Sequence, residues 1–326
     1  MNIEMIRAAA TRAQGIVRET PLVWSPFIDK IAGRRVLIKA ECLQHTGSFK
    51  YRGARSAISA LAAEGGAAGV LAYSSGNHAQ GIARAASEHG LASVIVMPSD
   101  APKMKIDNTR ALGAEVVLYD RATDDRDAIG AALAEERGLV LVKPFDNPHV
   151  IAGQGTTGLE IARQVHEAGV TEGEVLVCCG GGGLTSGIAL ALEACAPGLR
   201  ARPVEPEGFD DVARSLISGQ IERNTRTSGS LCDAIITPAP GEITLPIMQR
   251  LCGPGMVVPE DDCLRAMAAA FAHLKIVAEP GGAIALAAAL YHGDAVDGDT
   301  VIAVVSGGNV DPGVFRMALE RFGDST

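Results

Sequence analysis

The chain has 326 residues, 47% of them hydrophobic, which predicts one or two domains with a substantial buried core. Its formal net charge of -9 and the lack of any lysine- or arginine-rich run argue against a nucleic-acid-binding protein. No apolar run approaches the ~20 residues of a membrane span, and the N-terminus lacks a basic region followed by an apolar one. We therefore expect a cytoplasmic protein that binds neither nucleic acid nor membranes.

A helical pattern of apolar residues covers residues 1–20, and Pro21 closes it. After it, short β-branched runs alternate with alanine-rich helical stretches. The expected strands are 36–40, 70–73, 93–97, 115–119, 139–142, 175–179, 201–204 and 301–305. The expected helices include 54–63, 80–89, 103–112, 127–137, 155–168, 185–194, 264–273 and 282–291. This alternation predicts an α/β fold whose parallel sheets are covered by helices on both faces.

The seven cysteines are odd in number and stand mostly in apolar stretches. This composition predicts buried free thiols rather than a disulfide framework. The sequence contains no CxxC pair and no cluster of histidine and cysteine that would indicate a zinc site.

A lysine between the expected strand 36–40 and the expected helix 54–63 is the first candidate for chemistry. Lys50 stands in residues 46–54, which read TGSFKYRGA. Packing around its amine could desolvate it, lower its pKa and free it as a nucleophile toward aldehydes, which is Schiff-base chemistry. The alternative is a solvated charge, as most lysines at such junctions are.

A run of four glycines, residues 180–183, separates the expected strand 175–179 from the expected helix 185–194. Successive N–H groups of such a loop can turn inward, and a helix N-terminus adds partial positive charge, so the loop can bind phosphate without a cationic side chain. The spacing matches neither a Walker A loop nor GxGxxG, and it suits a single small phosphate. The alternative is a tight turn packed close to a neighbouring segment.

Two further loops follow the expected strands 70–73 and 301–305, with the sequences SSGNH at 74–78 and SGGN at 306–309. Both deliver small polar side chains to the carboxyl ends of parallel strands, where α/β sheets bind ligands, although either loop alone could be a helix cap. With Lys50 and the glycine loop they supply an amine, a phosphate site, an amide and a hydroxyl. These are the groups needed to hold pyridoxal phosphate (PLP).

The motifs TGSFKYRGA, SSGNHAQG, GGGGL and SGGN, in this order, resemble the fold-type II PLP enzymes, and the resemblance covers essentially the whole chain. The most similar branch contains threonine/serine dehydratases, serine racemases and 3-hydroxyaspartate dehydratases. Cysteine synthases and tryptophan synthase β chains share the fold, but their lysine motifs lack FKxRGA. The resemblance implies a large cofactor-binding domain of residues 1–68 and 147–326 and a small mobile domain of residues 69–146.

The resemblance also implies roles for residues around the cofactor. Lys50 would form the Schiff base with PLP and later exchange the Cα proton of the substrate. The other implied contacts are Phe49 on the ring, Asn77 at the ring hydroxyl, Glu279 near the cofactor, and the amides of Gly180, Gly181, Gly182, Gly183 and Leu184 at the phosphate. Glu279 could instead be only a helix-entry residue.

Ser306 would face the pyridine nitrogen of the cofactor. A hydroxyl at that place leaves the nitrogen largely unprotonated and weakens the electron sink compared with an aspartate partner. Elimination is then favoured over long-lived carbanions.

Two residues are expected near the substrate. Ser75 stands where racemases of this group have a serine on the cofactor face opposite the lysine, so racemisation is chemically open to this chain; alternatively, Ser75 caps the following helix. Arg126 stands near an arginine of the racemases that can reach the substrate carboxylate; alternatively, it is a solvated charge at a helix start.

The resemblance further implies a divalent metal site on an acidic loop. Its ligands would be Glu205, the carbonyl of Phe209 and Asp211, and oxygen ligands with waters suit Mg²⁺, Mn²⁺ or Ca²⁺. The alternative is a solvated acidic loop.

The implied activity is elimination of water from a short 3-hydroxy amino acid, with L-threonine and L-serine as leading substrates, giving a 2-oxo acid and ammonia. 3-Hydroxyaspartate dehydration is the second candidate and serine racemisation the third. Outside the enzymes, the alternative is a catalytically silent protein that binds PLP or an amino acid. We expect the protein to be a homodimer.

Overall fold

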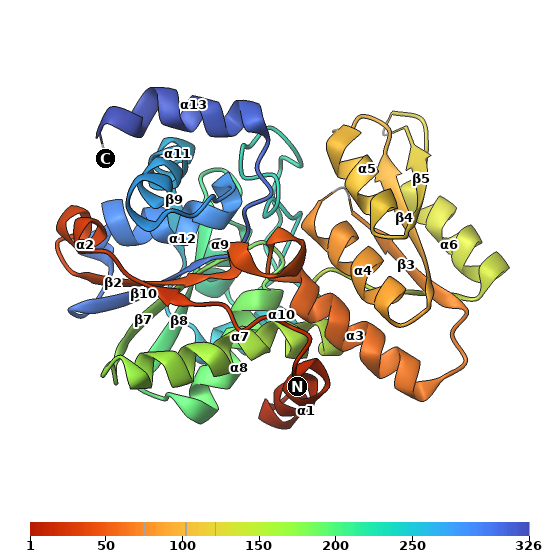
Figure 1. Cartoon of the computed structure of the whole chain (residues 1–326), viewed down its shortest axis with the longest axis horizontal. Helices are drawn as coiled ribbons and strands as arrows, with labels where there is room; N and C mark the ends of the chain where they lie inside the picture. Colours follow the sequence, from red (N-terminus) through yellow and green to blue (C-terminus); the bar gives the residue numbers. More distant parts are fainter. Residues whose placement is uncertain (75, 102, 121, 326) are drawn as a thin grey trace.

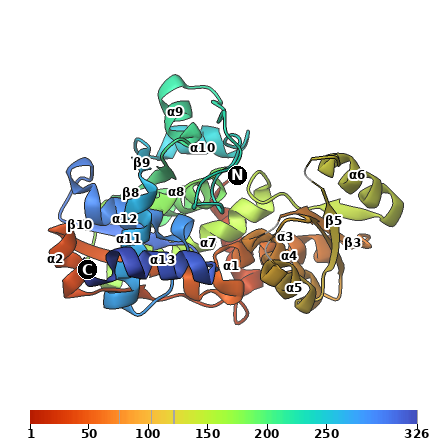
Figure 2. The same ribbon diagram turned by 90° about the horizontal axis from the view of Figure 1, so that it is seen from above.

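The computed structural model describes all residues except Ser75, Pro102, Arg121 and Thr326, and leaves the side chains of Met104 and Ser325 undescribed. It consists of two lobes, each built around its own sheet (Figures 1 and 2). None of the described helices is long and apolar enough to span a bilayer.

The larger lobe contains a six-stranded sheet in the order β1-β2-β10-β7-β8-β9. Its strands are β1 (Leu22–Val23), β2 (Arg35–Ala40), β7 (Gly173–Cys178), β8 (Leu199–Pro206), β9 (Met256–Val258) and β10 (Thr300–Val305). All neighbours run parallel except β1, which pairs antiparallel with β2. The central strands are buried on both faces, which explains their near-continuous apolar sequences.

Helices cover both faces of this sheet (Figure 1). On one face lie α11 (Glu260–Ala269), α12 (Pro280–Tyr291) and α13 (Pro312–Phe322), and on the other lie α1 (Ile3–Ala13), α7 (Pro148–Glu167) and α8 (Gly183–Cys195). The remaining helices of this lobe are α2 (Pro26–Ala32), α9 (Asp211–Ser218) and α10 (Thr244–Leu251). Because α12 is packed between the sheet and α11, its residues from Pro280 to Leu290 are all buried, and it is apolar on every side.

The smaller lobe contains a four-stranded parallel sheet in the order β5-β4-β3-β6. Its elements are β3 (Gly69–Tyr73), β4 (Ala92–Pro98), β5 (Glu115–Tyr119), β6 (Leu139–Leu141), α4 (Asn77–Glu88), α5 (Lys103–Ala111) and α6 (Arg126–Arg137). Val70 and Ala72 of β3 belong to the core shared with α4, whereas Leu71 packs with residues of α6. This alternation places α4 and α6 on opposite faces of the sheet.

Helix α3 (Lys50–Glu64) lies at the junction of the lobes, where it packs against both α4 and α7 (Figures 1 and 2). Its residues Tyr51 and Ile58 join the core of the smaller lobe. The domain boundary at residue 68, which assigns α3 to the larger domain, stays a prediction.

The first helix differs from its prediction, which extended it to Pro21. It ends at Ala13, because Gln14 leaves the helical region and Gly15 takes a left-handed φ of 74°. All seven cysteines are free, and all are buried except Cys195, as the sequence predicts.

Candidate active site

A cavity of about 310 Å³ lies between the two lobes and is lined by residues from both. The smaller lobe supplies Tyr73, Ser74, Gly76, Asn77 and His78, and the larger lobe supplies the glycine loop before α8. Of the residues predicted for the site, the cavity is lined by Phe49, Lys50, Asn77, Arg126, Gly180, Gly181, Gly182, Gly183, Leu184 and Glu279. Sequence segments far apart along the chain therefore meet at one place.

Lys50 is the first residue of α3 and its amine is buried in this cavity. Its Nζ atom donates a hydrogen bond to the carbonyl oxygen of Pro144 at 3.1 Å and lies 5.2 Å from the centre of the Phe49 ring. Burial lowers the pKa of Lys50 to about 8, against an ordinary value of 10.5. A substantial share of this amine is thus neutral near physiological pH, which is the form that attacks an aldehyde.

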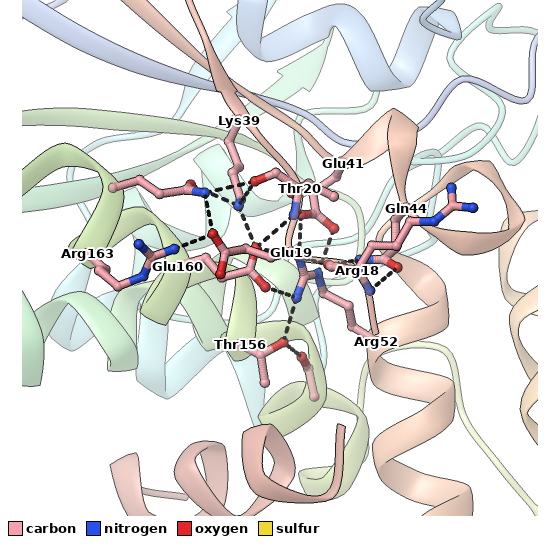
Figure 3. Close-up of polar contacts among 12 residues, drawn as sticks. Arg18, Glu19, Thr20, Lys39, Glu41, Gln44, Arg52, Thr156, Glu160 and Arg163 are labelled. Carbon is pink, nitrogen blue, oxygen red and sulfur yellow. Dashed lines mark hydrogen bonds and ion pairs between the residues drawn. The ribbon is translucent and has the colours of Figure 1, made fainter. Parts of the chain in front are cut away.

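The turn that carries Lys50 is anchored by four charged residues, the buried Lys39, Glu41 and Arg52 and the half-buried Glu160, called here the charge network (Figure 3). Arg52 donates to both oxygens of Glu41 at 2.7 and 2.8 Å and to both oxygens of Glu160 at 2.7 Å. Lys39 donates to Glu160 at 2.5 Å. The network joins β2, α3 and α7, so it holds the first turn of α3 in place.

The glycine loop runs from the end of β7 into the N-terminus of α8. A Cβ atom added at Gly181 would lie 2.2 Å from the ring of Phe145, and one added at Gly183 would lie 2.5 Å from Oε1 of Gln154. Gly182 has a φ of 89°, which favours glycine. Glycine at these positions lets the loop pass close to its neighbours. The N–H groups in the first turn of a helix have no partner within the helix, so the start of α8 provides a site for an anion such as phosphate.

Asn77 and Glu279 form a buried pair beside the loop. Asn77 donates from Nδ2 to Oε1 of Glu279 at 2.6 Å, and its Oδ1 accepts a hydrogen bond from Asn309 at 2.7 Å. Glu279 stands at the N-cap of α12, as the helix-entry alternative expects, but its side chain makes no capping hydrogen bond, and its role near a cofactor stays a prediction. Burial raises the pKa of Glu279 to about 7, although the bond from Asn77 opposes this shift.

Ser306 follows β10 and is buried next to the cavity residue Cys178. The Cys178 thiol donates to Oγ of Ser306 at 3.0 Å, and the backbone N–H of Phe49 donates to the carbonyl oxygen of Ser306 at 3.0 Å. These bonds connect Ser306 to the segment that carries Lys50.

The cavity residues other than Lys50 that carry positive charge come from the smaller lobe. Arg126 lies over the ring of Tyr73, 4.9 Å from its centre, and pairs with Asp127 at 2.9 Å. Lys105 of α5 pairs with Asp233 of the larger lobe at 3.1 Å, which links the two lobes across the cavity. The predicted Ser75 lies outside the described residues.

The predicted metal ligands lie apart from the cavity, where β8 meets α9. Glu205 accepts hydrogen bonds from the N–H groups of Val212 and Ala213 at 2.9 and 2.7 Å. Burial, followed by the charge of Asp211, raises the pKa of Glu205 well above its ordinary value, and burial raises that of Asp211 to about 6. Among the described residues no cluster of three or more His, Cys, Asp or Glu side chains could hold a metal, so a site here would depend on carbonyl and water ligands.

Several residues that line the cavity were not singled out from the sequence: His78, Lys105, Pro144, Phe145, Gln154, Cys178 and Asp233. His78 lies within the quoted motif SSGNHAQG, and Cys178 stands two residues before the motif GGGGL, so their neighbours along the chain were a usable signal. Gln154 and Lys105 line the cavity only because of how α7 and α5 pack, and the sequence around them gives no sign of this position.

The cavity groups fit PLP. The buried Lys50 amine suits the aldehyde of PLP, the glycine loop suits its phosphate, and the Gln154 Oε1 atom is buried without a hydrogen-bond partner among the described residues. A site with an unpaired buried polar atom is prepared for a polar ligand.

Curated relatives share most of the length of this chain. A serine racemase from Oryza sativa subsp. indica is 38% identical and aligns over 98% of this chain and 94% of its own length. An L-threo-3-hydroxyaspartate ammonia-lyase from Pseudomonas sp is 41% identical over 93% of both chains. An L-threonine ammonia-lyase from Thermotoga maritima is 38% identical over 98% of this chain and 79% of its own.

Solved structures agree with the predicted two-lobed fold. The threonine deaminase from T.th. superposes with a TM-score of 0.90 at 43% identity, covering 95% of this chain and 99% of that one. Maize serine racemase gives a TM-score of 0.89 at 35% identity, with 98% and 97% covered. The family described as "Pyridoxal-phosphate dependent enzyme" matches residues 13–307. The chain therefore belongs to the pyridoxal-phosphate dependent enzymes and has their fold-type II architecture.

Proposed function

We propose that this protein is a PLP-dependent ammonia-lyase that eliminates water from a short 3-hydroxy amino acid, with L-threonine and L-serine as the leading substrates. The observation that carries the proposal is the buried Lys50 amine, with its pKa lowered to about 8, in the cavity lined by the glycine loop. The intact amine also disfavours a catalytically silent binding protein.

The residues that would hold PLP come from both lobes. Lys50 would bind its aldehyde, the glycine loop and Leu184 its phosphate, and Phe49, Asn77, Glu279 and Ser306 its ring. When bound, PLP supplies an electron sink that acidifies the Cα–H bond of an amino acid.

Lys50 would act as the base that takes the Cα proton. A pKa of about 8 lets its amine both accept and return a proton near neutral pH. The β-hydroxyl leaves as water, and hydrolysis of the unsaturated amine product returns that water and gives a 2-oxo acid and ammonia. We propose that residues 69–146 move as the smaller domain and close on the substrate, which would exclude bulk water from the Lys50 amine.

A second candidate substrate is 3-hydroxyaspartate, because both Arg126 and Lys105 line the cavity. Each is paired with an exposed aspartate, Asp127 or Asp233, and such pairs contribute little, so a substrate carboxylate can replace them. Serine racemisation is the third candidate and depends on Ser75.

A substrate panel tests the proposal. L-Threonine, L-serine and L-threo-3-hydroxyaspartate are compared by steady-state release of 2-oxo acid, with chiral analysis of the remaining amino acid. Borohydride reduction of the holoenzyme should label Lys50, and Lys50→Ala should abolish turnover. Label on another lysine, or no oxo acid from any substrate, contradicts the proposed ammonia-lyase activity with Lys50 as its catalytic lysine.

D-Serine formation that disappears in Ser75→Ala, with elimination retained, would establish racemisation as a second activity.

We also propose that Mg²⁺, or Mn²⁺ or Ca²⁺, binds at Glu205, the Phe209 carbonyl and Asp211. The support is a pair of buried carboxylates with raised pKa values, one of which, Asp211, has an Oδ2 atom without a hydrogen-bond partner among the described residues. A cation would compensate both charges. Chelator should lower the melting temperature or the rate and Mg²⁺ should restore it. Identical melting curves and rates with and without chelator would leave the acidic loop without a metal.

A homodimer is the proposed assembly. Its support is a set of exposed aromatic side chains: Trp24, Phe27 and Phe271 are 53%, 61% and 45% exposed. Sedimentation of the wild type and of the double variant Phe27→Glu, Phe271→Glu tests the homodimer, since the double variant should sediment as a monomer.

The free cysteines support a proposed cytoplasmic location, which cell fractionation tests.

A further inference from the structure

Cys178 and Ser306 make a hydrogen bond that none of the predicted roles includes. Cys178 is the last residue of β7, and Ser306 directly follows β10, the neighbouring strand of the larger sheet. Both side chains are 3% exposed, and the distance from Sγ to Oγ is 3.0 Å. Cys178 lines the cavity in which PLP is proposed to bind.

The direction of this hydrogen bond decides what the Ser306 hydroxyl can do. Burial raises the pKa of the Cys178 thiol to about 11, so the sulfur carries its proton at neutral pH and can donate it. A serine hydroxyl has one proton and two acceptor lone pairs. When the thiol occupies a lone pair of Ser306, the hydroxyl proton remains available for another acceptor.

Among the described residues, Cys178 is the cysteine that lines the cavity. Cys179 contacts the carbonyl oxygen of Gly180 at 3.6 Å and the sulfur of Met248 at 3.9 Å, and it is also paired with the Thr185 hydroxyl. Cys232 and Cys263 lie 3.8 Å apart, and Cys232 is also paired with the Ser230 hydroxyl. A hydroxyl partner is therefore shared by several cysteines, and Cys178 is distinguished by having that partner next to the cavity.

We propose that Cys178 is a positioning residue, whose thiol donates to Ser306 and thereby directs the Ser306 hydroxyl proton toward the ring of the bound cofactor. This inference rests on the proposed function, in which Ser306 faces the pyridine nitrogen. Without the thiol, the hydroxyl is free to rotate among its staggered positions, and its proton points to the cofactor for a smaller share of the time. A weaker bond to the nitrogen and weaker cofactor binding follow.

The first test needs no cofactor. The S–H stretch absorbs in an infrared window free of other protein bands, and the difference between wild-type apoprotein and Cys178→Val isolates the Cys178 band. Ser306→Ala should move that band to the higher frequency of a free thiol. An unmoved band would show that the thiol does not donate to Ser306 and would overturn the proposal.

The second test measures what the hydrogen bond does to the cofactor. Apoprotein is titrated with PLP to obtain Kd, and the pyridine nitrogen resonance is recorded with ¹⁵N-labelled PLP. Cys178→Val should raise Kd roughly 2- to 10-fold, the range that one hydrogen bond is worth, and shift the resonance. Cys178→Ser keeps a donor and should restore both values toward wild type. Cys252→Ala, a buried cysteine remote from the cavity, is the matched control and should change neither.

A double-variant cycle separates this inference from the proposed role of Ser306. If Cys178 acts through Ser306, Cys178→Val should have no further effect on Kd or on the resonance in the Ser306→Ala background. If Ser306→Ala itself changes neither value, the proposed placement of Ser306 is wrong. If Ser306→Ala changes both but Cys178→Val changes neither, or tightens PLP binding, only the inference is wrong. Should Cys178→Val fail to fold by circular dichroism, Cys178→Ala takes its place.

Discussion

Two regions of this protein contain buried glutamates whose pKa values shift in opposite directions. In the charge network, Arg52 and Glu41 share two hydrogen bonds. Burial alone would raise the pKa of Glu41, but Arg52, together with Lys39 and Thr20, outweighs burial and holds that pKa below its ordinary value. In the cavity, burial prevails and raises the pKa of Glu279 to about 7. The lysines do not show this contrast, because burial lowers the pKa of Lys50 to about 8 and also lowers that of Lys39 in the network.

The charge network and the cavity also differ in whether their buried polar atoms have hydrogen-bond partners. Gln154 Oε1 and His78 Nδ1 are buried at the cavity without hydrogen-bond partners among the described residues. The atoms of the network are bonded to one another and to Thr20 and Thr156 (Figure 3). The network is thus complete in the protein alone and stabilises the fold, whereas the cavity lacks partners that a ligand would supply.

The two buried lysines provide the largest expected contrast. Lys50→Ala should lower turnover by at least ~10²–10⁴-fold, because it removes the proposed base. It should leave the melting temperature of the cofactor-free protein unchanged or higher, since it also removes a desolvated amine. Steady-state oxo-acid release and thermal melting of the apoprotein measure the two effects.

Lys39→Met is the matched control, because Lys39 is a fully buried lysine that belongs to the network and not to the cavity. It should lower the free energy of unfolding by about 1–3 kcal/mol and leave most of the turnover. Comparable losses of turnover in both variants would mean that the two regions are not functionally distinct.

Removing one charge from the network should lower the stability of the protein. Arg52→Met leaves the fully buried Glu41 without its main cation and should lower the free energy of unfolding by about 3–5 kcal/mol. Urea unfolding of the apoprotein measures this change. Arg163, whose ion pairs are exposed, is the control: Arg163→Met should stay within about 0.5–1 kcal/mol of wild type (Figure 3). Equal effects at both positions would show that burial does not strengthen the network.

Much of this arrangement was predictable from the sequence. The alternation of apolar runs and helical stretches located the main parallel strands, because buried strands need continuous apolar residues whatever surrounds them. Lys50, Asn77 and the glycine loop, which come from three of the four motifs, line one cavity, since the ends of parallel strands meet at one edge of a sheet.

The remaining features depend on long-range packing. The two- and three-residue strands β1 and β9 are too short to show a period. Glu160 and Arg52 are far apart in sequence, and neither residue type reveals that it is buried until its partner is known. Gln154 stands among small residues of α7, where periodicity predicts only a buried helix face.

The two regions should also respond to pH with opposite signs. Glu279 has a pKa of about 7 in the folded protein and an ordinary value of 4.5. Its contribution to stability is therefore complete below pH 4.5 and is lost as the pH rises through 7, by about 3 kcal/mol in all. Glu41, with a lowered pKa, contributes stability above pH 4.5 that is lost as the pH falls through its folded pKa.

Apoprotein unfolding measured from pH 8 down to well below pH 4.5 checks both signs. The stability of wild type relative to Glu279→Gln should fall toward high pH, and its stability relative to Glu41→Gln should fall toward low pH. Parallel curves for the two variants would contradict the difference between Glu41, which is ion-paired with Arg52, and Glu279, which is hydrogen-bonded to the neutral Asn77.

The smallest expected effect compares two unpaired polar atoms on one helix. Gln154 and Thr157 both lie on α7, and each has a buried oxygen without a hydrogen-bond partner among the described residues, but only Gln154 lines the cavity. Replacing either by an apolar residue of similar shape, Gln154→Met or Thr157→Val, removes an unsatisfied group and should leave the stability of the apoprotein equal or about 1 kcal/mol higher.

Titration with PLP should then separate the two variants. Gln154→Met should weaken PLP binding roughly 2- to 10-fold, as expected for the loss of one hydrogen bond to the ligand, while Thr157→Val should bind PLP as the wild type does. Unchanged binding in Gln154→Met would mean that an unpaired atom at the cavity is no sign of a ligand contact in this protein.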